Sequence, residues 1–221
     1  MLKIGITGSI GAGKSFVGEL LRERNFRVLD ADRKVHELYR DCEELRVEMA
    51  AFFGEECLTP TGVNSALVAD RIFADASARE KLEQIVYPYL TSAVGAFFNA
   101  DAECAANVSE NGDGKCARFV EAALFSRAPS LVKMLDEIWI VDAPERVRLQ
   151  RLVARGLKEN DAARRIENQR GACAPEMFPG KRIRMLTNDG NRSQIENQLE
   201  NLLENYGSSP EFIPVPEPGR G

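Results

Sequence analysis

The chain has 221 residues and a net charge of −5, with 44% apolar and 29% charged residues. This composition is typical of a globular domain with a hydrophobic core, and an acidic chain without a basic run is a poor candidate for nucleic-acid binding. No apolar stretch approaches the roughly 20 residues that cross a membrane, and the N-terminus lacks the long apolar core of a signal peptide. We therefore expect no membrane partner.

The cysteines and the histidine limit redox and metal chemistry. Five cysteines stand at wide spacings without a CxxC pair, at positions 42, 57, 104, 116 and 173. Their odd number indicates reduced thiols in a cytoplasmic protein. His36 is the only histidine, which argues against a zinc site and suits a surface or packing role.

The hydrophobic pattern predicts short buried strands that alternate with helices. Strands are expected at 2–7, 26–30, 117–125, 137–143 and 182–189, and helices at 14–24, 33–53, 66–98, 144–169 and 191–206. A loop is expected at 54–65, a helix break at Pro88, a surface loop at 100–116 and a mobile tail at 207–221. The alternation favours an α/β fold with a mainly parallel sheet covered on both faces, and the long block at 66–98 favours an inserted or lid-like subdomain.

The first expected strand runs directly into ITGSIGAGKS, whose three glycines would weaken any regular element. The spacing Gly8-x-x-x-x-Gly13-Lys14-Ser15 is a complete Walker A pattern between a strand and a helix. Its backbone N–H groups and the helix N-terminus form a concave phosphate site. In such a site Lys14 reaches the β- and γ-phosphates and Ser15 ligates Mg²⁺, so the sequence predicts a triphosphate site.

A carboxylate pair ends the second expected strand, in Leu29-Asp30-Ala31-Asp32. Ligands bind at the carboxyl edge of a parallel sheet, where a carboxylate can accept a proton from an attacking hydroxyl. Asp32 is the candidate base and Asp30 the reserve. Capping of the following helix is the alternative for either residue.

Arginines crowd the expected helix at 144–169 and could stabilise the charge of a moving phosphoryl group. Arg151, Arg155 and Arg165 are the candidates, and a solvated helix face is the alternative. Glu121 interrupts the apolar run RFVEAALF, where a carboxylate costs free energy unless it is paired or near a metal. It could hold a water on Mg²⁺, or form a salt bridge with a buried arginine.

In several segments, which occur in the family's order, the chain resembles the dephospho-CoA kinase family. ITGSIGAGKS looks like its P-loop and VLDAD like its acceptor segment. Further matches are FFGEECL, DRIFAD, KLEQIVYP, EAALF, WIVDAPERVRLQRLVAR, RIENQ and LTNDGN, so the resemblance covers about residues 2–205.

The resemblance implies ATP-dependent phosphorylation of the ribose 3′-hydroxyl of dephospho-CoA, the last step of coenzyme A synthesis, with Mg²⁺. It implies a three-layer P-loop kinase domain over 1–206, with a helical acceptor-binding insertion at about 54–100 and a helical lid at about 146–180. By this resemblance Asp32 is the base, Lys14 is catalytic, and Arg151 lies near the transferred group. ATP is held by the P-loop residues Gly8, Gly11, Ala12, Gly13, Lys14, Ser15 and Phe16.

The chain departs from the family's pattern mostly on the acceptor side. Tyr87-Pro88 replaces His-Pro, Asn64-Ser65 replaces Asn-Arg, and Ala122 to Ser126 replace Pro-Leu-Leu-Phe-Glu. Another small-molecule or nucleotide kinase on the same core therefore stays an alternative. A nucleotide-dependent switch is a third, although the segment at 187–190 lacks the Asn-Lys-x-Asp order with which small GTPases read guanine. The sequence does not indicate an oligomeric state.

Overall fold

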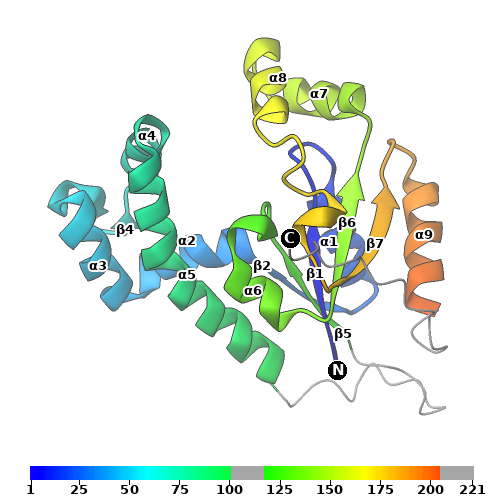
Figure 1. Ribbon diagram of the computed structural model, residues 1–221, viewed down its shortest axis with the longest axis horizontal. Helices are drawn as coiled ribbons and strands as arrows, with labels where there is room; N and C mark the ends of the chain where they lie inside the picture. Colours follow the sequence, from blue (N-terminus) through cyan, green and yellow to red (C-terminus); the bar gives the residue numbers. More distant parts are fainter. Residues whose placement is uncertain (101–116, 205–221) are drawn as a thin grey trace, which may run out of the picture. The chain divides into compact units, whose positions relative to one another are not determined.

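The structure is a computed structural model that describes residues 1–100 and 117–204 (Figure 1). The expected surface loop from 101 onwards and the expected tail at 207–221 lie outside the described residues. The chain forms two compact units, one made of Met1–Leu29 and Ala100–Gly221 and the other of Asp30–Asn99.

A five-stranded sheet in the order β2-β5-β1-β6-β7 forms the centre of the first unit. Its strands are β1 Leu2–Thr7, β2 Arg27–Asp30, β5 Ala117–Glu121, β6 Glu137–Asp142 and β7 Arg182–Thr187. β1 pairs in parallel with β5 and β6, and β6 pairs in parallel with β7. Because parallel strands end at the same edge, the loops after β1, β5, β6 and β7 gather at the carboxyl edge of the sheet.

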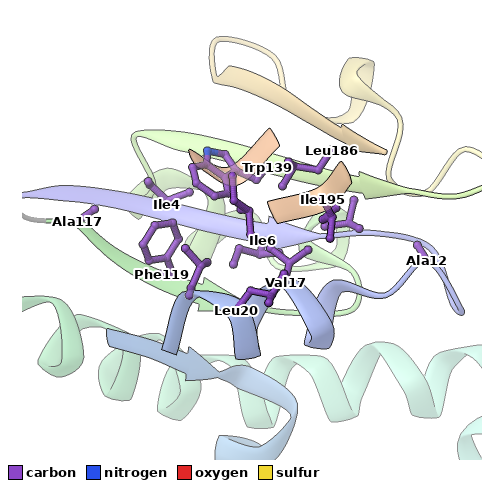
Figure 2. Close-up of a cluster of buried hydrophobic side chains, with 13 residues drawn as sticks. Ile4, Ile6, Ala12, Val17, Leu20, Ala117, Phe119, Trp139, Leu186 and Ile195 are labelled. Carbon is purple, nitrogen blue, oxygen red and sulfur yellow. The ribbon is translucent and has the colours of Figure 1, made fainter. Parts of the chain in front are cut away.

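Helices cover both faces of this sheet, as its continuous apolar strands require. The helices of the first unit are α1 Lys14–Glu23, α6 Pro129–Met134, α7 Glu145–Ala154, α8 Glu159–Glu167 and α9 Arg192–Glu204. α1 and α9 bury Val17, Leu20 and Ile195 against Ile4 and Ile6 of β1 (Figure 2). This gives one apolar layer between helices and sheet.

The opposite face of the sheet shows why β1 alternates large and small residues. Side chains point to opposite faces along a strand, so Gly5 lies on the face away from Ile4. A Cβ at Gly5 would stand 2.9 Å from the Phe125 ring and even closer to Leu135, at the end of α6. The missing side chain therefore lets the second helical layer approach, and the expected three-layer α/β fold is confirmed.

The second unit is mostly helical. It contains α2 Ala31–Asp41, α3 Glu43–Phe53, α4 Ser65–Ala74 and α5 Ala76–Asn99, with a small antiparallel pair of β3 Leu58–Thr59 and β4 Gly62–Val63. Its own core holds Leu45, Met49, Phe53, Val68 and Ile85. The separate core explains why this segment interrupts the strand–helix alternation.

Two expectations about helix breaks were wrong. α5 continues through Pro88, where we expected a break, because Val86 and Leu90 are buried on either side and packing offsets the lost hydrogen bond. The break falls instead at Asp75, whose extended backbone ends α4 and whose carboxylate accepts bonds from the N–H and hydroxyl of Ser77 at 2.8 Å. Extended backbone at Cys42 likewise divides the helix expected at 33–53.

Other boundaries moved by a few residues. The strand expected at 117–125 ends at Glu121, and a short 3-10 turn follows at Phe125–Arg127. The arginine-rich helix divides into α7 and α8, because Gly156 between them has a φ of 92°. Among the described residues no helix is long and apolar enough to cross a membrane.

Candidate active site

The P-loop connects β1 to α1 at the carboxyl edge of the sheet. Gly11 and Gly13 have φ values of 80° and 98°, which side-chain-bearing residues rarely adopt. Gly13 is the N-cap of α1. The N–H groups of Gly11, Gly13, Lys14 and Ser15 have no acceptor within residues 1–100 and 117–204. These donors at a helix N-terminus form an anion-binding cradle.

Two other predicted P-loop residues use their N–H groups inside the protein. Ala12 donates to the carbonyl of Ser9 at 3.0 Å, and Phe16 donates to the carbonyl of Gly13 at 3.1 Å. These bonds shape the loop. The phenyl group of Phe16 lines a neighbouring cavity.

Gly13 has no room for a side chain, because a Cβ there would collide with the amide nitrogen of Asn188. We expect Gly13→Ala to lower the free energy of unfolding by about 3 kcal/mol, since backbone strain and steric overlap add. It should also abolish measurable ADP binding. Thermal denaturation and ADP titration check both effects.

Gly180→Ala is the matched control. Gly180 also has a positive φ, 73°, but open space surrounds the position of its Cβ. Gly180→Ala should lower the free energy of unfolding by only about 1 kcal/mol, from backbone strain alone, and should keep full ADP affinity. Equal destabilisation by the two substitutions would contradict the steric argument.

Lys14 supplies the mobile cation of the site. Its side chain is half-buried, and its ammonium makes no hydrogen bond or ion pair in the described part of the chain. A cation that forms no ion pair among these residues, beside N–H groups that have no acceptor there, raises the local positive potential. This is the electrostatic environment that a polyphosphate requires.

Ser15 and Glu121 meet although 106 positions separate them. The Ser15 hydroxyl donates to Oε1 of Glu121 at 2.5 Å, and Glu121 is only 2% exposed. The pairing of β1 with β5 sets Ile6 opposite Glu121, which brings this carboxylate to the start of the P-loop. The hydroxyl and the carboxylate therefore lie together at the start of α1, and their role in holding Mg²⁺ stays a prediction.

Arg151 of α7 forms hydrogen bonds with backbone carbonyl groups of the P-loop. Its Nη1 donates to the carbonyls of Gly11 and Ala12, each at 3.1 Å. Its Nη2 donates to Oδ1 of Asn188 at 3.0 Å, and Asn188 donates in turn to the carbonyl of Ala12 at 2.9 Å. Arg151 thus fixes the loop's shape and adds positive charge behind the cradle.

Electrostatics around Arg151 favour an anionic ligand. Burial and the nearby positive charge of Arg155 lower the pKa of the Arg151 guanidinium, while Asp189 opposes the shift. Arginine nevertheless stays protonated at neutral pH. The partly buried guanidinium of Arg151 and the exposed Arg155 beside it repel each other, and a bound phosphate would offset this repulsion.

A cavity of about 350 Å³ adjoins the cradle within the first unit. Its walls include Gly13, Phe16, Arg151, Ala154, Arg155, Asn188, Gly190 and Arg192. The Arg192 guanidinium lies 5.6 Å from the centre of the Phe16 ring. Aromatic and guanidinium planes with amide groups nearby suit a flat heteroaromatic ligand.

The two aspartates after β2 differ in their contacts. Asp30 is the N-cap of α2 and accepts from the N–H of Arg33 at 3.0 Å, so the capping alternative is confirmed for this residue. Asp32 is exposed in the first turn of α2 and belongs to the second unit. Lys14, Ser15, Glu121 and Arg151 come together in the first unit.

The other two candidate arginines also differ in their position. Arg155 lines the cavity beside the cradle, whereas Arg165 is exposed on α8. Asn188 was not predicted as a site residue, although it follows β7 directly and is 4% exposed. A polar residue at the carboxyl end of a strand was the available signal.

These features define a P-loop nucleotide-binding protein of the kinase type: a strand followed by the glycine loop, a Lys14 ammonium without a partner among the described residues, and the Ser15–Glu121 pair. A family profile described as dephospho-CoA kinase matches residues 2–174. A dephospho-CoA kinase from Corynebacterium efficiens is 34% identical over 171 residues, which cover 76% of this chain and 80% of that protein. The chain belongs to the dephospho-CoA kinase family, which confirms the resemblance.

Solved structures show the same fold. The crystal structure of TT1252 from Thermus thermophilus has a TM-score of 0.67 and 24% identity, and the match covers 92% of this chain and 97% of that one. A dephospho-CoA kinase from Campylobacter jejuni has a TM-score of 0.61 and 18% identity, with 93% and 96% covered. At these identities the comparison supports the three-layer P-loop kinase fold.

Proposed function

We propose that this chain transfers the γ-phosphoryl group of ATP to the ribose 3′-hydroxyl of dephospho-CoA and releases coenzyme A and ADP. The observation that carries the proposal is a complete phosphate cradle, with Lys14 unpaired among the described residues, in a chain that belongs to this family over residues 2–174. The cradle explains ATP binding, and the family supplies the acceptor.

The triphosphate would lie along the cradle, with its oxygens on the N–H groups of Gly11, Gly13, Lys14 and Ser15. Lys14 would contact the β- and γ-phosphates. The nucleoside would extend into the neighbouring cavity, between Phe16 and Arg155. Arg151 would act mainly from behind the loop, because its guanidinium already donates to two loop carbonyls.

Asp32 would act on the acceptor. Its carboxylate would take the proton of the 3′-hydroxyl while that oxygen attacks the γ-phosphorus. The bond between the γ-phosphorus and the bridging β–γ oxygen breaks, and the charge leaves on ADP. Lys14 and the cradle N–H groups stabilise the charge that spreads over the moving group.

The residues present fit Mg²⁺, which prefers oxygen ligands and is commonly held by one or two protein groups together with substrate phosphates. Ser15 would bind it directly, and Glu121 would hold one of its waters. Bound there, Mg²⁺ would neutralise phosphate charge. Within the described residues no group of three or more His, Cys, Asp and Glu side chains forms an alternative metal site.

Glu121→Gln tests the metal assignment. The amide can still accept from the Ser15 hydroxyl but carries no charge. We expect the Mg²⁺ concentration for half-maximal rate to rise by about 10- to 100-fold, as for the loss of other outer-sphere metal partners. Rates measured against Mg²⁺ at fixed ATP give this value.

Glu137→Gln is the control for removing a buried carboxylate. Glu137 is also fully buried, but it accepts from Nε1 of Trp139 and Nε of Arg184, away from the P-loop. This variant should lose stability and keep its Mg²⁺ dependence. A Glu121→Gln enzyme with unchanged Mg²⁺ dependence would overturn the metal role.

An acceptor panel tests the reaction itself. ADP formation should rise strongly with dephospho-CoA and little with AMP, CMP or adenosine. If one of the other acceptors stimulated ADP formation instead, the chain would be a kinase for that acceptor on the same core. The departures from the family's pattern at Tyr87, Ser65 and Ser126 allow this alternative. A preference for GTP without any acceptor effect would favour a nucleotide switch.

We place the reaction in the cytoplasm. Cys42, Cys57 and Cys173 are free thiols, while Cys104 and Cys116 lie outside the described residues. Burial raises the pKa of the Cys173 thiol, which keeps it protonated and unreactive. Thiols in this state suit a reducing compartment.

A further inference from the structure

The tip of the P-loop is attached to the pair of helices α7 and α8. Ile10 packs against the small apolar cluster of Leu152, Ala162 and Ile166. Gly11, next to it, approaches the α7 backbone so closely that a Cβ would lie 2.9 Å from the carbonyl of Arg148. The α7–α8 pair therefore contacts the loop on the side of its tip, in addition to the Arg151 contacts with its carbonyls.

One polar bond completes this attachment. Oε1 of Gln169 accepts from the N–H of Ile10 at 2.8 Å, across 159 positions of sequence. A main-chain N–H can only donate, so the amide oxygen of Gln169 must face it. This N–H belongs to the Ser9–Ile10 peptide, and the next peptide along the chain, Ile10–Gly11, carries the Gly11 N–H of the cradle.

The backbone of Gln169 is fixed on both sides of its side chain. Its N–H donates to the carbonyl of Ile166 at 3.2 Å, and its carbonyl accepts from Ala172 at 3.0 Å. The turn after α8 thus holds the amide in place. Ile166 connects this turn to the same apolar cluster that receives Ile10.

We infer that Gln169 is a positioning residue for the phosphate cradle: it orients the Ser9–Ile10 peptide and thereby aims the N–H of Gly11 at the β-phosphate. This rests on the proposed nucleotide site but not on the identity of the acceptor. Through Gln169 and Ile10, the position of α7–α8 sets the shape of the loop. Loss of the bond should weaken the binding of phosphates and leave nucleoside binding intact.

The test compares ADP with adenosine on the full-length chain, without any acceptor. Gln169→Met keeps the length of the side chain and removes the acceptor oxygen. We expect its Kd for ADP to rise about 10-fold, because the variant loses one hydrogen bond that orders the loop for phosphate binding. Adenosine affinity, measured by ligand-observed NMR, should change less than 2-fold. The midpoint of thermal unfolding should stay unchanged.

Asn168→Ala is the control, because Asn168 is exposed on the same turn and no side-chain hydrogen bond of it is present in the described residues. It should bind ADP normally. Gln169→Ser provides a second variant and should match Gln169→Met. Unchanged ADP affinity in both Gln169 variants would overturn the inference, as would equal losses for ADP and adenosine. Because no acceptor is present, failure to phosphorylate dephospho-CoA would leave this test valid.

Discussion

Lys14→Ala should lower kcat/KM for ATP by at least about 1000-fold, or roughly 4 kcal/mol of transition-state stabilisation. The ammonium is the mobile cation beside the cradle, and it forms no competing ion pair with any described carboxylate. Its removal leaves the growing charge on the β–γ bridge without its counter-ion. Initial rates over a range of ATP concentrations measure the loss.

The fold should survive this substitution, because the half-buried Lys14 contributes no core contact. Circular dichroism and the thermal midpoint should match those of the unmodified chain. Lys133→Ala, which removes an exposed lysine from α6, controls for loss of a positive charge and should be fully active. A Lys14→Ala protein with near-normal activity would disprove the assignment of the P-loop.

Asp32→Asn should lower kcat by about 1000-fold and change ATP affinity by less than about 3-fold. The amide keeps the shape of the side chain but cannot accept the hydroxyl proton. ATP binding depends on groups of the first unit, so the cradle is unaffected. Single-turnover rates and equilibrium ATP titration separate the two effects.

Asp30→Asn provides a matched control two residues away. Asparagine caps helices as well as aspartate does, so α2 should be preserved and kcat should fall only slightly. If Asp32→Asn weakened ATP binding as much as it slowed turnover, Asp32 would have a structural or metal-binding role. The contrast between the two aspartates is therefore the informative measurement.

Local patterns predicted the P-loop well. Gly8 to Ser15 are contiguous, and strand, loop and helix each have a strong local signal. The short apolar run at 2–7 likewise predicted a buried strand, which is β1. Features that depend only on residues close together in the sequence were thus predictable.

Features that depend on tertiary contacts were not predictable in the same way. Burial singled out Glu121, but only the pairing of β1 with β5 brings it to Ser15. Helical periodicity could not choose between Arg151 and Arg165, because that choice depends on which face of α7–α8 meets the loop. Gln169 carries no local signal at all.

The error at Pro88 has the same origin. A proline rule describes an isolated helix, whereas α5 gains apolar packing on both sides of the proline. Intrinsic preferences are smaller than the burial of several large side chains. Sequence rules were therefore most reliable where the local and tertiary requirements agreed.

The attachment of α7–α8 to the loop bears on how the enzyme would respond to ATP. Arg151, Ile10 and Gln169 connect the helix pair to both sides of the cradle. A change in loop shape on phosphate binding would therefore be transmitted to these helices. The expected lid at 146–180, which includes them, stays a prediction that the nucleotide experiments address.

Product analysis tests the central claim most directly. The chain is incubated with ATP, Mg²⁺ and dephospho-CoA, and the products are identified by phosphorus NMR and mass spectrometry. We predict one new phosphomonoester on the ribose 3′-oxygen for each ADP formed. ADP without a phosphorylated acceptor, or a phosphate at any other position, would contradict the proposed function.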